Sequence, residues 1–194
     1  MHAAPPAVPD PSLSVASADG RETVNLPAYR FVPCVEPFRW EGVPVTAYQQ
    51  TPALEADFAG VTRQTLFGRS GEAIGFEVRY FEIAPGGWSA LERHEHAHAV
   101  IGLRGVGKVL MGDTVRTLGF LDLAYIGPNC VHRLVNDEST PFGFLCIVDA
   151  RRDRPRRLRP ADVSELLADQ TLAAVILRSV KGKIAGERKG DGVG

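Results

Sequence analysis

The sequence has little of what marks several large classes of protein. Only three cysteines occur, Cys34, Cys130 and Cys146, and an odd number at wide spacing excludes a disulfide framework or a zinc ribbon. No apolar run approaches the roughly 20 residues of a membrane span. The formal net charge is -1, so no general attraction to nucleic acid or anionic lipid is expected. The N-terminal residues lack a basic leader and an apolar core. We therefore expect a cytoplasmic protein whose ligand is a small molecule.

The remaining composition is that of a globular protein, with 44% hydrophobic and 23% charged residues in 194, and the length fits one domain with additional segments. Residues 1–22 are rich in Pro, Ala and Ser, which predicts a flexible tail. Aromatic and β-branched residues alternate with prolines over 23–72, which predicts an N-terminal arm that packs on the main body.

The C-terminal part, residues 151–194, begins with six arginines between positions 151 and 159. Such a run predicts a solvated linker, with a phosphate site or an acidic partner as the alternative. The apolar residues over 161–177 have near-helical spacing, which predicts a helix docked on the body or on a second subunit. The end of the chain is predicted to be disordered.

Between these parts, residues 73–150 predict a series of short strands. Each is bounded by Gly, Pro, Asn or Asp in stretches such as "PGG", "RGVG" and "GPN", which are typical of tight turns. No helical period separates the strands, so an all-β sandwich or barrel is expected. The predicted strands cover 74–83, 98–105, 107–111, 114–118, 121–126, 130–135 and 142–148.

The stretch "LERHEHAHAV", residues 91–100, places a potential metal ligand at every second position. These ligands are Glu92, His94, His96 and His98. In a strand, residues of one parity point to one face, and Cys130 and His132 share a parity further along the chain. Nitrogen, oxygen and sulfur donors together suit a first-row divalent metal better than calcium. The sequence thus predicts a metal site inside a barrel and leaves open which side chains are its ligands.

Residues 85–136 resemble the cupin family in "PGG", "LRGVG", "LDLAYIGP" and "HRLVN". The first cupin motif is Gly, five residues, His-x-His, three or four residues, Glu, six residues, Gly. Counting from Gly86 to Gly105 places Glu92, His94 and His98 at the three ligand positions, with Glu and one His exchanged. The resemblance implies a cupin double-stranded β-helix, a jelly-roll barrel flanked by the N-terminal arm and the C-terminal helix.

The second motif is Gly, five residues, Pro-x-Gly, two residues, His, three residues, Asn. His132 and Asn136 fit it, whereas Leu121, Gly127 and Asn129 stand at the Gly, Pro and Gly positions. The turn before His132 is therefore expected to differ in shape from the family's.

Together the two motifs imply that Glu92, His94, His98 and His132 bind one divalent metal, with Mn or Fe favoured and Co, Ni or Zn possible. His96 then lies outside the metal's ligands or contacts the substrate. A second register takes His94 and His96 as the His-x-His pair, but it leaves Val100 at the Glu position. A barrel without metal would hold a costly set of unsatisfied polar groups.

Cys130, two residues before His132, is expected to face the same interior. A thiol near a divalent cation is a nucleophile at neutral pH, and the alternative is a small buried apolar side chain. We take Cys34 and Cys146 as structural. A metal beside a reactive cysteine is similar to the small bacterial cupins that act on methylthioxylulose phosphate. That resemblance implies a metal that polarises the ketone and a thiol that accepts the methylthio group, giving deoxyxylulose phosphate, before an external thiol removes it.

Two other functions stay open. One is a non-haem iron dioxygenase or isomerase in which Cys130 only packs, and the other is a non-catalytic sensor that binds a small ligand through the metal. No helix-turn-helix pattern with a basic recognition helix occurs, so a regulator that binds DNA by itself is not expected. We expect a homodimer, because cupins often pair edge strands and both terminal segments could cover an open edge.

Overall fold

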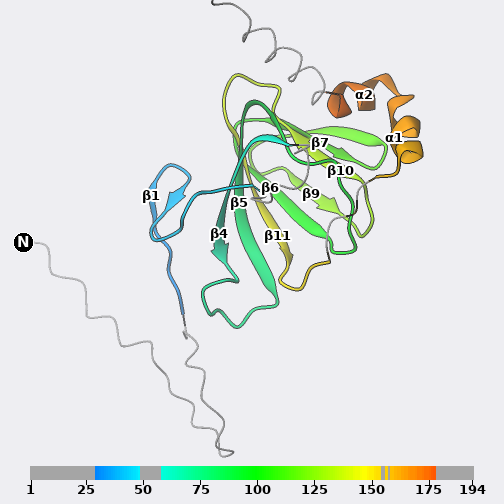
Figure 1. Ribbon diagram of the computed structural model, residues 1–194. Coiled ribbons are helices and arrows are strands. Elements are labelled where there is room, and N and C mark those ends of the chain that lie inside the picture. Colours follow the sequence, from blue (N-terminus) through cyan, green and yellow to red (C-terminus); the bar gives the residue numbers. More distant parts are fainter. Residues whose placement is uncertain (1–28, 49–57, 154–155, 157, 178–194) are drawn as a thin grey trace, which may run out of the picture.

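The computed structural model describes residues 29–48, 58–153, 156 and 158–177. The predicted tail over 1–22 and the predicted disordered end lie outside these residues. Antiparallel strands curl into a nearly closed barrel (Figure 1), with a hairpin of β1 (Cys34–Glu36) and β2 (Arg39–Trp40) on one side and two short helices on the other. The prediction of an all-β barrel is confirmed.

The strands predicted between residues 73 and 150 are all present. Their sheet has the order β8-β7-β10-β5-β11-β6-β9, and each neighbouring pair is antiparallel. The strands are β5 (Phe76–Trp88), β6 (His98–Arg104), β7 (Gly107–Met111), β8 (Thr114–Leu118), β9 (Leu123–Ile126), β10 (His132–Val135) and β11 (Phe142–Asp149).

Part of the predicted N-terminal arm also belongs to this sheet. Strand β4 (Ala59–Phe67) pairs with β5, and the short β3 (Thr46–Ala47) pairs with β4. Both faces of β4 are partly buried, because Val61 belongs to the core of the barrel whereas Leu66 packs with Val43 and Tyr80 in a second cluster. β4 therefore contributes one wall of the barrel.

The interior of the barrel follows from strand alternation on β11. Its side chains at every second position are buried and contact apolar residues of β5, such as Phe81 and Ile83. Burying each large apolar side chain contributes about 1.5–3 kcal/mol. The four inward residues of β11 are Phe142, Phe144, Cys146 and Val148.

Several turns around the barrel use the left-handed backbone conformation, among them those at Gly105, Leu121 and Asn129. Gly105 has φ +60°, and a Cβ added there would lie 2.4 Å from the carbonyl oxygen of Pro141, so only glycine fits. Leu121 and Asn129 have φ +64° and +60°, although they replace the glycines of the second cupin motif. The backbone thus keeps, at these two positions, a conformation that glycine adopts most readily.

The C-terminal segment forms two helices instead of the single helix predicted over 161–177. These are α1 (Pro160–Leu167) and α2 (Gln170–Ile176). The carboxylate of Asp169 accepts hydrogen bonds from the backbone N–H groups of Thr171 and Leu172, which caps α2 and starts a new helix. Among the described residues, neither helix has the length and apolar character needed to cross a membrane. Helix α2 packs on β7 and β10 through Leu172, Val175, Ile176, Leu110 and Val135.

Candidate metal centre

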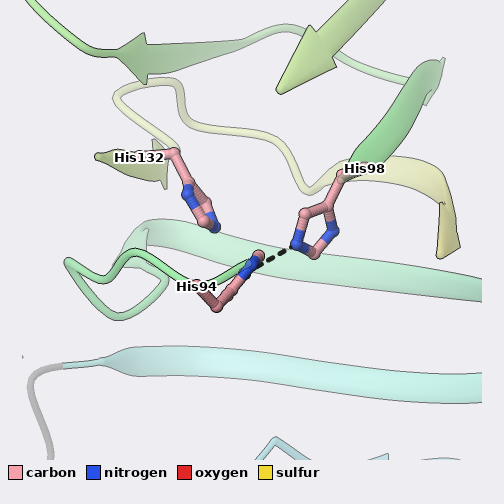
Figure 2. A group of neighbouring side chains, drawn as sticks. All are labelled: His94, His98 and His132. Carbon is pink, nitrogen blue, oxygen red and sulfur yellow. Dashed lines mark hydrogen bonds between the residues drawn. The ribbon is translucent and has the colours of Figure 1, made fainter. Parts of the chain in front are cut away.

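Three imidazoles meet inside the barrel, two from neighbouring positions of the chain and one from a later strand (Figure 2). His98 is the first residue of β6, His132 is the first of β10, and His94 lies in the segment between β5 and β6. Their ligand atoms all lie within 4.8 Å of one another, and the Nε2 atoms of His94 and His98 are 2.8 Å apart. His94 is only 2% exposed. Three nitrogen donors therefore converge on one buried point.

The other ring nitrogen of each histidine has a partner that orients the ring. Nδ1 of His94 donates to the carbonyl oxygen of His96 at 2.8 Å, and Nδ1 of His132 donates to that of Cys130 at 2.9 Å. A carbonyl oxygen only accepts, so the proton of each neutral ring is on Nδ1 and Nε2 keeps its lone pair. Fixing the tautomer in this way is typical of histidines that bind a metal.

The electrostatics of the cluster keep the imidazoles neutral. Burial, followed by the neighbouring rings, lowers the pKa of His94 to about 4 and that of His98 to about 2. Burial also lowers the pKa of His132. Divalent metals bind the neutral imidazole, so these three side chains fit a first-row divalent ion at neutral pH.

Glu92, the predicted carboxylate ligand, lines the same pocket but is not in the group of atoms within 4.8 Å. Its backbone pairs with that of His132 through two hydrogen bonds of 3.0 and 3.2 Å. Its carboxylate accepts a hydrogen bond from the hydroxyl of Tyr48 at 3.3 Å. The structure thus brings Glu92 to the pocket wall, and its role as a ligand stays a prediction.

His96 lies against His94, with ring centroids 3.5 Å apart and an interplanar angle of 4°. Its Nδ1 is 2.6 Å from Oδ1 of Asp153, and His94, His96 and Asp153 form a second group whose ligand atoms lie within 4.8 Å. We predicted that His96 lies outside the metal's ligands or contacts the substrate, and that it is a ligand only in the second register. These contacts do not test that prediction, which stays a prediction.

The local backbone explains why His94 and His96 stack. In a regular strand, the side chains of two residues on the same face are held apart by the strand repeat. His94 and His96 are not in a strand, because β6 begins only at His98. The carboxylate of Asp153 accepts hydrogen bonds from the backbone N–H groups of Glu95 and His96, at 2.9 and 3.2 Å. Asp153 therefore holds a bend in the segment. Because of this bend, the alternation of a regular strand does not predict where the side chains of His94 and His96 point.

Two of the cysteines lie near this centre in different ways. Cys130 is half-buried, packs against the apolar core and does not line the pocket, and burial raises the pKa of its thiol. Cys146, which we predicted to be structural, lines the pocket and is 3% exposed. Its Sγ lies 3.0 Å from Nδ1 of His98. Burial raises the pKa of the Cys146 thiol, while the charge of Arg79 acts in the opposite direction.

Three arginines also line the pocket, and sequence reasoning assigned none of them to it. Arg63 comes from β4 and Arg79 from β5, whereas Arg152 belongs to the run predicted to be a solvated linker. Arg152 forms an ion pair of 2.9 Å with Glu77. Side chains alternate along β4 and β5, and the set that points into the barrel includes Arg63 and Arg79. This alternation is the signal that could have identified them from the sequence.

Comparisons with known proteins agree with this description. Residues 79–148 match the family described as "Cupin domain". A 1-methylthio-D-xylulose 5-phosphate methylsulfurylase from Rhodospirillum rubrum is 41% identical over 146 residues, covering 75% of this chain and 91% of that protein. The crystal structure of a cupin 2 conserved barrel domain protein from Rhodopseudomonas palustris, also 41% identical, matches with a TM-score of 0.69 over 75% of this chain and 97% of that one. A cupin-2 domain structure from Rhodospirillum rubrum, again 41% identical, has a TM-score of 0.65 over 74% and 94% of the two chains.

Proposed function

This chain belongs to the cupin family, and on that premise we propose that it is a metal-dependent enzyme that converts methylthioxylulose phosphate to deoxyxylulose phosphate by methylthio transfer to a thiol. The observation that carries the proposal is a thiol inside the histidine pocket: Cys146 contacts His98 and lines the same cavity as His94 and His132. The 41% identity to a methylsulfurylase supports the choice of substrate.

His94, His98 and His132 would hold the metal, with Glu92 as the predicted fourth ligand and Mn or Fe as the favoured ion. When bound, the metal supplies a Lewis acid that polarises the ketone of the substrate. The chain supplies the ring orientations, through the carbonyl oxygens of His96 and Cys130, and a pocket whose apolar wall includes Phe81 and Phe144. Such a wall limits access of water to the reacting carbon.

The transfer step uses a cysteine thiolate. The thiolate sulfur attacks the methylthio sulfur, the carbon–sulfur bond of the substrate breaks, and its electron pair stays on the carbon next to the ketone. Protonation of that carbon gives the methyl ketone, and the protein keeps a methyl disulfide. An external thiol then takes the methylthio group as a mixed disulfide and restores the cysteine. Nη2 of Arg79, 3.2 Å from Sγ of Cys146, favours the thiolate in this step.

Two cysteines are candidates for this role. Cys146 is our assignment because it lines the pocket, and Cys130, predicted from its place beside His132, stays the alternative. We expect Cys146→Ser to keep its metal and to lower turnover of methylthioxylulose phosphate by at least about a thousandfold, as loss of a nucleophile does. The matched variant Cys130→Ser should stay within about threefold of the wild type.

Turnover, metal content and the mass of the methyl disulfide intermediate are the measurements. The opposite pattern would assign the role to Cys130, and full turnover in both variants would refute methylthio transfer to a cysteine. Activity that needs iron and dioxygen would indicate a dioxygenase instead. Tight ligand binding without turnover would indicate a sensor.

The predicted homodimer stays a prediction, and β9 is the place to test it. This strand is at one end of the sheet order, beside β6, and its Leu123 is 76% exposed, next to exposed Phe120 and Tyr125. Exposed apolar side chains on an edge strand favour pairing with another chain. We expect light scattering to give twice the chain mass of 21.0 kDa and Leu123→Lys to give a monomer. A monomeric wild type would contradict the prediction.

A further inference from the structure

Two arginines face the pocket without a carboxylate partner among the described residues. Arg79 is 8% exposed, Arg63 is half-buried, and the Nε atom of each is buried without a hydrogen-bond partner. The described contacts of the Arg79 guanidinium are Sγ of Cys146 and the ring of Phe81, whose centroid is 5.1 Å away. Buried guanidinium groups usually bind an acceptor on each donor side, so these side chains have free donors inside a cavity.

The register of the sheet places these donors beside the thiol and the histidines. Arg63 on β4 is paired with Phe81 on β5, two residues from Arg79 and thus on the same face. Arg79 is in turn the cross-strand partner of Cys146 on β11, and Cys146 contacts His98 on β6. An anion bound to the arginines would therefore lie in the same cavity as the candidate metal centre.

The charges around the arginines are unbalanced. Glu77 faces this cluster and forms ion pairs with Arg69 at 2.6 Å and Arg152 at 2.9 Å. Arg63 and Arg79 add two further cations. The side chain of Arg69 is 64% exposed and therefore solvated, so the less exposed guanidinium groups of Arg63, Arg79 and Arg152 with one carboxylate give a formal charge of +2. Burial, followed by the charge of Arg79, lowers the pKa of Arg63. An excess of positive charge away from water is costly, and a bound anion would offset that cost.

The other carboxylates of the pocket are already engaged. Asp153 binds the ring of His96 and the backbone of that segment, and Glu92 accepts from Tyr48. Neither carboxylate is a described partner of Arg63 or Arg79, so the free donors of these arginines remain available to a ligand.

We propose that Arg63 and Arg79, with Arg152 beside them, form a subsite that binds the phosphate group of a sugar-phosphate substrate. Guanidinium forks match phosphate oxygens in geometry and in charge. The choice of a sugar phosphate rests on the proposed function, whereas the assignment of an anion subsite rests on the arginines. Nη2 of Arg79 stays on Cys146, so the phosphate would be held by the free donors, which include Nε of Arg63 and Nε of Arg79. The carbon chain of the sugar would then extend toward Cys146 and His98, where the methylthio end and the ketone would react.

Calorimetric titration of the metal-loaded protein tests the subsite. The probes are deoxyxylulose phosphate, unphosphorylated deoxyxylulose and inorganic phosphate. We expect Arg63→Gln to weaken binding of the phosphorylated sugar by about ten- to hundredfold, as loss of a charged hydrogen bond does, and to leave binding of the unphosphorylated sugar unchanged. The matched control is Arg116→Gln, which makes the same change at an exposed position of β8 that does not line the pocket.

Arg79→Gln should give at least as large a loss, but this buried side chain also contacts Cys146, so the half-buried Arg63 carries the test. Equal affinity of the wild type for the two sugars, or an unchanged affinity of Arg63→Gln for the phosphorylated one, would overturn the subsite.

If inorganic phosphate binds through Arg63 but methylthioxylulose phosphate is not turned over, the subsite stands and the proposed function fails. If methylthioxylulose phosphate is turned over but Arg63→Gln binds the phosphorylated sugar as the wild type does, the proposed function stands and the subsite fails.

Discussion

The two ends of the barrel interior are built by the same strands and differ in chemistry. On β11, Phe142 packs in an apolar cluster at one end, and Cys146 lines the pocket at the other. On β5, Ile83 and Arg79 show the same contrast. At the apolar end, packing is so close that a Cβ added at Gly107 would lie 2.3 Å from the ring of Phe142. One strand can therefore supply both a rigid apolar support and a set of directed polar groups, separated by only a few residues.

The largest expected effect comes from the apolar end. Phe142→Ala removes a side chain with 0% exposure and should lower the free energy of unfolding by about 3–5 kcal/mol, because a cavity remains. Urea unfolding of the metal-free protein measures this change. The matched control is Phe31→Ala, at 85% exposure, for which we expect a change within about 0.5 kcal/mol. Folded Phe142→Ala should still bind one metal, and loss of that metal without loss of stability would contradict the division between the two ends.

A pH titration should show the second effect, at the polar end. The unfolded chain protonates His94 near its ordinary pKa of 6.5, but the folded protein protonates it only near about 4. The unfolded state therefore binds more protons in this window, and stability falls as pH decreases through it, by up to about 3 kcal/mol for His94 alone. Unfolding of the metal-free protein at several pH values measures this. In His94→Gln the dependence should be weaker by that amount, and an identical slope in both proteins would show that His94 is not a buried neutral group.

The smallest expected effect concerns the support of the centre. Cys146→Ala removes the atom that contacts Nδ1 of His98 and should weaken metal affinity by about ten- to hundredfold, which is typical of residues that orient a ligand. Cys146→Ser keeps a polar atom at this place and should lose less. Cys130→Ala, a control outside the pocket, should keep the wild-type affinity in a competition assay with a metal chelator. If Cys146→Ala did the same, the sulfur would not orient His98.

The strands and part of the candidate centre are predictable from the sequence for identifiable physical reasons. Alternation and turn residues depend on local chemistry, so the strands between residues 73 and 150 could be predicted closely. His98 and His132 stand at the starts of strands and at motif spacings, and motif spacing also brought in His94. Cys146 and Arg79 are different, because their contact depends on which strands pair, and pairing is not a local property.

The C-terminal segment shows the same limit. A run of arginines is usually solvated, and composition alone gave no sign that Arg152 would pair with Glu77, 75 residues earlier in the chain. The break between α1 and α2 was more accessible, because Asp169 is a good capping residue. The near-helical spacing on both sides of it concealed the break.

The contact between Asp153 and the segment at His96 also bears on the order in which parts of the protein are synthesised and fold. The two residues are 57 positions apart, and Asp153 follows the last strand of the barrel. The histidine segment is therefore synthesised well before the carboxylate that bends it, and the stacked arrangement of His94 and His96 can form only after β11 has been made and paired. Such long-range contacts form slowly, so we expect the geometry of the candidate centre to be completed late in folding.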